Sequence, residues 1–356
     1  MKTSCLQLWQ LCFSDSPAFT ELYFRLRYTD KQTEALWRDG RVVSAMQLLP
    51  YPLSFCGSVV PMAYVSGACT HPAYRGQGLM TDLLEQALRR MRREGVAVSA
   101  LIPAEPGLWD FYSRVGYAPA FSRRWEVWHP SEAGQDGSGQ ASALDSSVRQ
   151  PLTFGVAAED VVPEVYRRLY RQDRSHPCYV LHTRADLRVV MEAVRLWGGQ
   201  VWTLRQGRRL RAWAVGWPDH RERREVVWLE AGTWRTEGDR RQLLAHICCS
   251  NHVDSVLAPP AAGHSGQSQP LGMARLVDVP CLLTHFARCF PSSEMTFHLT
   301  DPQLTANTGY YVLRNGQCTT SSRPLPGVAQ WDELTPAALA RRLFDGLAGE
   351  MRLMLD

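Results

Sequence analysis

This sequence has few lysines, no CxxC pair and no long apolar run. Only Lys2 and Lys31 are lysines, so arginine carries nearly all of the positive charge. The net charge of +4 over 356 residues is too mild to indicate nucleic-acid binding. No window approaches the roughly 18 consecutive apolar residues of a membrane-spanning helix, and residues 1–10 lack the apolar stretch of a signal peptide. We therefore expect a cytoplasmic protein without a membrane or nucleic-acid partner.

The ten cysteines form no CxxC motif, and several lie within apolar runs. A reducing compartment keeps such residues as free thiols, so we expect no disulfides. The spacing of His246, Cys249 and His252 puts them on one helix face, but no further ligand cluster accompanies them. We expect a helix surface there and no metal.

The length predicts two or three domains. Residues 131–150 are rich in Gly, Ser and Gln and have no aromatic side chain, which is typical of a linker. The segments on either side mix helical and strand patterns, which indicates an α/β (α+β) protein. We predict domains at 1–130, 151–275 and 276–356.

The first domain contains a strand, a glycine-rich turn, an amphipathic helix and a second strand in succession. The helix begins near Leu79, has one apolar face, and stops at Gly95. Asp39-Gly40 is a strong hairpin signal. The expected elements are a helix over 17–28, a hairpin over 34–49, strands over 59–70 and 96–102, and a short helix over 109–115.

The second domain repeats this order with a strand over 225–232, a helix over 240–252 and a strand over 254–257. Its turn, residues 233–238, has one glycine and a glutamate. Because a carboxylate repels phosphate, we interpret this unit as a degenerate copy without a ligand. The third domain shows strand alternation over 295–299 and 309–314, an Asn315-Gly316 turn, and a helix that starts at Thr335-Pro336.

The turn in the first domain, Arg75-Gly-Gln-Gly78, leads directly into a helix. Such a turn directs unpaired backbone N–H groups and the positive end of the helix dipole at one point, which suits a phosphate. The dinucleotide fingerprint needs a third glycine, but position 81 is threonine, and the P-loop lysine is also absent. Both common nucleotide motifs are thereby excluded.

Two motifs together resemble the GNAT superfamily of acyl-CoA-dependent N-acetyltransferases: Tyr74-Arg-Gly-Gln-Gly-Leu79 and Phe111-Tyr-Ser-Arg-Val-Gly-Tyr117. The resemblance implies that the loop amides hold the pyrophosphate of coenzyme A and that the strand edge pairs with its pantetheine arm. One position departs from the family pattern, since Met80 stands where Gly or Ala is usual; a contact through backbone N–H tolerates this. The implied acetyl-CoA-binding residues are Ala68, Cys69, Thr70, Arg75, Gly76, Gln77, Gly78, Leu79, Met80 and Thr81.

The layout of three domains is similar to the Eis-type acetyltransferases, whose third domain resembles sterol carrier proteins. The similar segments are Phe297-His-Leu-Thr-Asp-Pro-Gln-Leu304 and Asn307-Thr-Gly-Tyr-Tyr-Val-Leu313. The resemblance implies tandem GNAT-type domains followed by a small sterol-carrier-like domain. It also implies that Tyr112 is the general acid and the α-carboxylate of Asp356 the base.

The resulting prediction is transfer of an acetyl group from acetyl-CoA to a primary amine of a small molecule or peptide. Tyrosine suits the acid because a pKa near 10 keeps it protonated at neutral pH. The alternatives are a non-catalytic acyl-CoA or lipid-binding protein, and a scaffold that kept the fold without the chemistry. Relatives of this layout commonly form homo-oligomers, so a homo-oligomer is a candidate state.

Overall fold

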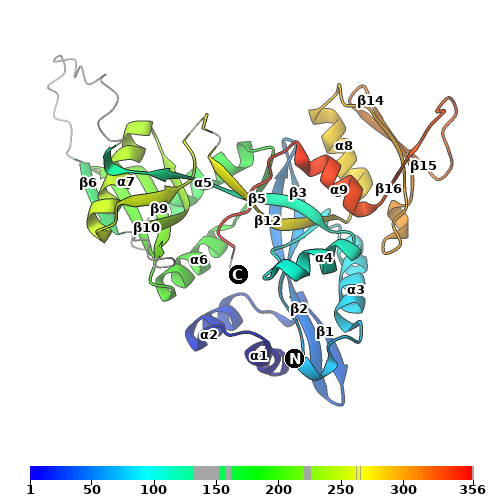
Figure 1. The fold of residues 1–356 in the computed structure, drawn as a ribbon, viewed down its shortest axis with the longest axis horizontal. Coiled ribbons are helices and arrows are strands. Elements are labelled where there is room, and N and C mark those ends of the chain that lie inside the picture. Colours follow the sequence, from blue (N-terminus) through cyan, green and yellow to red (C-terminus); the bar gives the residue numbers. More distant parts are fainter. Residues whose placement is uncertain (132–151, 157–161, 220–225, 262, 265, 355–356) are drawn as a thin grey trace.

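The computed structural model describes residues 1–131, 152–156, 162–219, 226–261, 263–264 and 266–354. The predicted linker 131–150 lies outside the described residues except for its first position. In the described part the strands form one large mixed sheet and a separate sheet of four strands, and helices pack against both (Figure 1). This mixture confirms the predicted α/β class.

The first unit begins with two helices and continues as a strand meander and a strand–helix–strand crossover. Its part of the sheet has the order β1-β2-β3-β4-β12-β5, in which only β3 and β4 are parallel neighbours. Asp39 and Gly40 turn β1 into β2 with positive φ angles of 48° and 73°, as the Asp-Gly pair predicts. The elements are α1 Lys2–Cys12, α2 Pro17–Leu26, β1 Thr33–Arg38, β2 Arg41–Phe55, β3 Ser58–Thr70, α3 Leu79–Arg93, β4 Val98–Leu101, α4 Pro106–Arg114, β5 Ala118–Trp128 and β12 Gln267–Leu276.

Two features of this unit were not predicted from the sequence. One is α1, which packs its buried residues Cys5, Leu8 and Trp9 against β2 and β3. The other is the position of β12, which follows the second unit in the chain but inserts between β4 and β5. Local patterns predict that a segment is a strand, but they do not encode a neighbour that is more than a hundred residues away in the chain.

The second unit continues the large sheet beyond β5 in the order β11-β10-β9-β8-β6. Its strand–turn–helix–strand core is present as predicted, although the helix begins at Glu237 rather than Arg240. The cause is a cap: Thr236 and Asp239 form a capping box that starts the helix earlier. The elements are β6 Leu152–Val156, α5 Val162–Ser175, β7 Cys178–Val180, α6 Arg184–Leu196, β8 Gln200–Gln206, β9 Arg209–Asp219, β10 Val226–Trp234, α7 Glu237–Asn251 and β11 Ser255–Ala258.

The third unit is the four-stranded sheet, in the order β15-β14-β13-β16, with two helices. Asn315 and Gly316 form the β14–β15 turn with φ angles of 52° and 74°, and Thr335 caps α9, both as predicted. The resemblance to sterol carrier proteins stays a prediction. The elements are α8 Val279–Cys289, β13 Met295–Leu299, β14 Gly309–Arg314, β15 Gln317–Ser321, β16 Asp332–Leu334 and α9 Pro336–Asp345.

A buried ion pair joins the third unit to the first. Arg275 of β12 donates to Asp301 at 2.6 Å, and both side chains are inaccessible. The same guanidinium donates to the carbonyl oxygen of Val115, the residue after α4. Breaking a buried pair of this kind typically costs several kcal/mol. The pair therefore fixes the end of α4 against the sheet.

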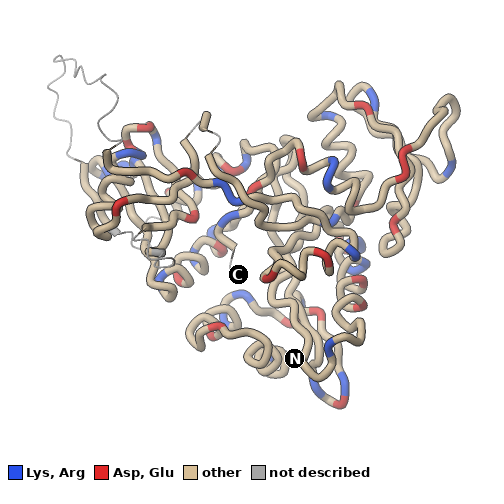
Figure 2. Tube along the Cα trace, viewed as in Figure 1, with Lys and Arg blue, Asp and Glu red and all other residues tan. Residues whose placement is uncertain are grey.

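Acidic and basic residues are interspersed along the described chain (Figure 2). Ion pairs within α3 and between units, such as Arg27 with Asp186, are part of this pattern. None of the described helices is long and apolar enough to cross a membrane.

Candidate active site

The parallel strands β3 and β4 pair over three residues and then separate. The paired residues are Met62–Tyr64 with Val98–Ala100. Directly beyond them β3 has a bulge, where Gly67 and Ala68 lie opposite the single residue Met46 of β2. A bulge increases the local twist and bends the strand. The β4-facing edge of β3 beyond Tyr64, which includes the predicted Ala68, Cys69 and Thr70, is therefore open for another extended chain to pair with.

The bulge depends on glycine, and α1 covers it. Gly67 has a φ of +59°, and a Cβ atom there would lie 2.0 Å from the ring of Trp9. The indole N–H of Trp9 is fixed by Asp15 at 2.8 Å, and next to the bulge Tyr23 donates to Ser66 at 2.8 Å. This support was not predicted from the sequence. A glycine inside a strand pattern is the signal that could have indicated the bulge.

The N-terminus of α3 has free backbone donors. Arg75 N–H bonds to Pro72, and the next paired amide is Asp82 N–H, which bonds to Gly78. Within the described chain, the six backbone N–H groups from Gly76 to Thr81 have no hydrogen-bond partner. Gly78 is the N-cap and supplies no side-chain cap. Together with the helix dipole, these donors make an anion site.

Glycine gives this loop its shape, and Met80 leaves it open. Gly76 and Gly78 have φ angles of +77° and +79°, which other residues rarely adopt. The Met80 side chain packs inward on the same apolar cluster as Ala68 and Tyr112. It therefore does not cover the loop amides. Three of the predicted site residues, Ala68, Met80 and Tyr112, are thereby brought to one cluster.

Two thiols and a guanidinium lie at the end of the open strand edge. The Cys12 thiol donates to the carbonyl oxygen of Thr70 at 3.5 Å, and Arg75 Nε donates to the same oxygen at 3.1 Å. A hydrogen bond with the Cys69 thiol lowers the pKa of Cys12 to about 7, and Arg75 contributes to the shift. The same interaction, together with burial, raises the pKa of Cys69. A thiol with a lowered pKa therefore lies beside the predicted coenzyme-binding edge.

Tyr112 projects from α4 into the apolar cluster between α3 and β3. It is 7% exposed, and its ring contacts Phe111 and Tyr117 with centroids 5.1 and 5.8 Å away. Burial raises the pKa of Tyr112 to about 12, so the hydroxyl is protonated at neutral pH. No described residue hydrogen-bonds to this hydroxyl. It is therefore a proton donor without a protein acceptor among them.

The tail after α9 crosses the molecule in extended form. Gly349 accepts from Ser122 of β5 at 2.8 Å, and Glu350 exchanges backbone hydrogen bonds with Cys178 and Val180 of β7. Gly349 is required at this crossing because a Cβ would lie 2.3 Å from the Ala120 carbonyl oxygen. The tail thus bridges β5 and β7.

The last described residues of the tail are buried and held from two sides. Leu353, 2% exposed, donates its N–H to Glu230 at 3.1 Å and accepts from His182 Nε2 at 3.2 Å. Burial lowers the pKa of His182 to about 4, so its ring is neutral and donates through Nε2. Neither His182 nor Glu230 was predicted from the sequence. The predicted base, the carboxylate of Asp356, lies outside the described residues.

The second strand–turn–helix unit has no comparable anion site at its helix. Residues 235–236 alone separate β10 from α7, whereas residues 71–78 separate β3 from α3. The first-turn amide of Asp239 bonds to Thr236, and the Asp239 carboxylate bonds back to Thr236 and pairs with Arg211. These contacts place a carboxylate where a phosphate would have to bind.

A metal centre is absent from the part of the chain that the structure describes. No group of three or more His, Cys, Asp or Glu side chains there could hold an ion. His246 stacks on Phe154, and His252 ends α7 in the left-handed conformation. All ten cysteines are free thiols.

Residues 2–120 match the family model for the acetyltransferase (GNAT) domain. This stretch is similar to the GNAT acetyltransferase domain. The matched region covers the open strand edge, the α3 loop and Tyr112. No curated protein sequence matches the chain.

Solved structures share the fold of this chain over nearly its whole length. A GCN5-related N-acetyltransferase from Kribbella flavida has a TM-score of 0.73 and 16% identity, and the match covers 99% of this chain and 95% of that one. Another, from Anabaena variabilis ATCC 29413, has a TM-score of 0.71 and 16% identity, and the match covers 95% of this chain and 86% of that one. Eis1 from Mycobacterium abscessus has a TM-score of 0.70 and 14% identity, and the match covers 97% of this chain and 86% of that one. At these identities the likeness establishes the fold.

Proposed function

We propose that the protein transfers an acetyl group from acetyl-CoA to a primary amine of a small molecule or peptide. The observation that carries this proposal is the run of unpaired amides from Gly76 to Thr81 at the end of an open strand edge. Loop amides would hold the pyrophosphate, and Ala68, Cys69 and Thr70 would pair with the amide groups of the pantetheine arm. The loop residues concerned are Arg75, Gly76, Gln77, Gly78, Leu79, Met80 and Thr81.

The chemistry needs one proton donor and one proton acceptor. The amine nitrogen attacks the thioester carbonyl carbon, a C–N bond forms, and the C–S bond breaks as the electron pair returns to sulfur. Tyr112 donates a proton to the departing sulfur. The α-carboxylate of Asp356 takes the proton that the amine loses. The burial that raises the pKa of Tyr112 supports the first role, and the anchored tail at Leu353 supports the second.

Holding both substrates in one site supplies much of the remaining rate enhancement. The acceptor nitrogen must carry a proton that it can lose, because a stable amide forms only when that proton leaves. Thr70, Cys12 and Arg75 form the wall at the coenzyme end. The bulge around Ser66 and Gly67, covered by α1 and α2, lies toward the acetyl end of the edge.

The test is release of coenzyme A thiol from acetyl-CoA with polyamines, aminoglycosides and N-terminal peptides as acceptors. We expect release with at least one amine, together with the acetylated product by mass spectrometry. Binding of acetyl-CoA by calorimetry without release would support the carrier function instead. If neither binding nor release were detected, the coenzyme site itself would be contradicted.

A further inference from the structure

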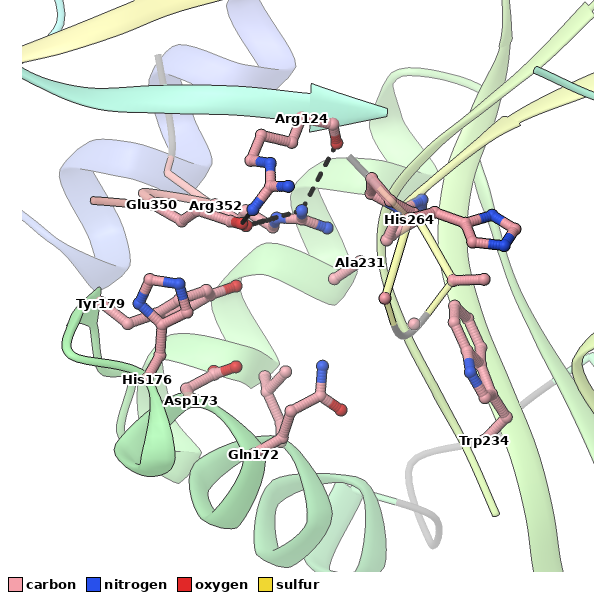
Figure 3. Close-up of a pocket in the computed structure, with 16 residues that line it drawn as sticks. Arg124, Gln172, Asp173, His176, Tyr179, Ala231, Trp234, His264, Glu350 and Arg352 are labelled. Atoms are coloured by element: carbon pink, nitrogen blue, oxygen red, sulfur yellow. Dashed lines mark hydrogen bonds and ion pairs between the residues drawn. The ribbon is translucent and has the colours of Figure 1, made fainter. Parts of the chain in front are cut away.

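The second unit has a splayed pair of parallel strands of its own, and a cavity of about 500 Å³ opens in it (Figure 3). Strands β10 and β11 pair only over Val226–Trp228, and β10 then has a bulge at Glu230. Beyond the bulge, Ala231 and Trp234 of β10 line the cavity. Residues of α5 and of the tail after α9 also line it. A volume of this size accommodates a small molecule.

Asp173 is the polar group that lacks a partner in this cavity. Its side chain comes from α5, points into the cavity in Figure 3, and is 2% exposed. Its Oδ1 atom has no hydrogen-bond donor among the described residues. Burial raises the pKa of this carboxyl well above its usual range. A buried acceptor without a donor is costly, so a ligand that supplies an N–H donor there would be bound favourably.

The opposite side of the cavity is basic. Figure 3 shows Arg124 and Arg352 across the cavity from Asp173 and Gln172. Both arginines share one carboxylate, because Arg352 lies 2.6 Å and Arg124 3.7 Å from Glu350. Glu350 thus lies between two guanidinium groups, and the Arg124 side chain is 29% exposed. The cavity therefore presents a carboxyl at one side and two guanidinium groups at the other.

Apolar residues make up another part of the lining, namely Leu169, Ala231, Trp234 and Pro260. His176, Tyr179 and His264 also line the cavity. A ligand with an ammonium group, a carboxylate and a small apolar side chain matches all three parts of this lining. A phosphate-bearing coenzyme does not, because the described residues of the lining include no run of free backbone amides like that of Gly76 to Thr81.

We propose that this cavity binds a small zwitterion of the amino-acid type, with its ammonium on Asp173 and its carboxylate facing Arg124 and Arg352. The site is separate from the acetyl-transfer site and is independent of the function proposed above. Glu350 and Arg352 belong to the tail that continues to Leu353, so the bound molecule would contact that segment.

The experiment is calorimetric titration of the full chain with three matched probes. L-leucine carries both charges, isopentylamine lacks the carboxylate, and 4-methylpentanoate lacks the ammonium. We expect saturable binding of L-leucine and at least about tenfold weaker binding of either single-charge probe. Equal binding of isopentylamine, or no saturable heat with leucine at millimolar concentration, would overturn the assignment.

Substitution separates this cavity from other sites that could hold an amino acid. Asp173→Asn keeps the shape and removes the carboxyl that can ionise beside a bound ammonium, and it should weaken leucine binding at least about tenfold. Glu164→Gln is the matched control, because Glu164 lies on the same helix and pairs with Arg168 outside the cavity lining. Unchanged binding in the Asp173→Asn variant would contradict the proposal. The probe series on the unaltered protein tests the same assignment even if that variant folds poorly.

Discussion

The two strand–turn–helix units of this chain follow the same plan up to the end of a strand and then diverge. In each, a parallel pair extends over three residues and the first strand then has a bulge. In the first unit a glycine loop leads to α3 and leaves six amides unpaired. In the second, a two-residue turn leads to α7, where the capping box of Thr236 and Asp239 occupies the Asp239 amide and places a carboxylate at the N-terminus. A helix N-terminus can bind an anion only where its own side chains leave the amides free.

The two clefts, each formed where a parallel strand pair separates, also differ in their lining. In the first cleft an open backbone edge lies beside an apolar cluster that contains Tyr112. The second is lined by charged side chains of α5, β5 and the tail. No helix is described between β11 and β12 that would correspond to α4. Both units therefore have a cleft because they share a topology. The residues of the turn and of the cleft lining determine what each cleft can bind.

Removing the Tyr112 hydroxyl should have the largest effect, because Tyr112 is the proposed general acid of the first cleft. A positioned general acid typically contributes 10²- to 10⁴-fold, so Tyr112→Phe should lower kcat by about that factor. The affinity for acetyl-CoA should stay the same, since the loop amides are untouched. Steady-state kinetics and calorimetry on the same preparation test both statements.

Tyr117→Phe is the matched control for the tyrosine. Tyr117 is fully buried next to Tyr112, and its hydroxyl bonds to Ser99 at 2.7 Å. We expect a loss of thermal stability with kcat largely retained. A Tyr112→Phe variant with normal turnover would remove this residue from the mechanism.

A carboxylate at the N-terminus of α3, like the one that Asp239 places at α7, should remove much of the difference in anion binding between the two helices. Gly78→Asp places a negative charge at the N-cap of α3, where the pyrophosphate is proposed to bind. We expect acetyl-CoA affinity to fall about tenfold or more, which corresponds to about 1.4 kcal/mol. The measurement is a calorimetric Kd at fixed ionic strength.

Gly95→Asp controls for backbone strain in that experiment. Gly95 follows the same helix with a φ of +74°, against +79° for Gly78, and neither position has an atom within 4 Å of an added Cβ. Both variants therefore carry a similar strain, but only Gly78 is at the anion site. An equal loss of affinity in both would show that strain rather than charge is responsible.

The sequence predicted the first cleft better than the second. Glycines with positive φ, the amphipathic helix and the Phe-Tyr motif are local signals, and all of them lie close together in the chain. The β12 insertion, the Arg275–Asp301 pair and the tail contacts at His182 and Glu230 join residues far apart in sequence. Asp173 shows the same limit, because an aspartate on an amphipathic helix has no pattern that distinguishes a buried acid from a solvated one.

Removing the cap of the second helix should have the smallest effect and tests why that cleft is closed to coenzyme. Thr236→Ala frees the Asp239 amide and should cost about 1 kcal/mol of stability. Thr183→Ala, which removes the equivalent capping box of α6, should cost a similar amount. The acetyl-CoA stoichiometry should stay at one per chain, because the two-residue turn still provides no loop for a pyrophosphate. If calorimetry instead detected a second coenzyme site in the Thr236→Ala variant, the cap rather than the short turn would be the reason why the second cleft does not bind coenzyme.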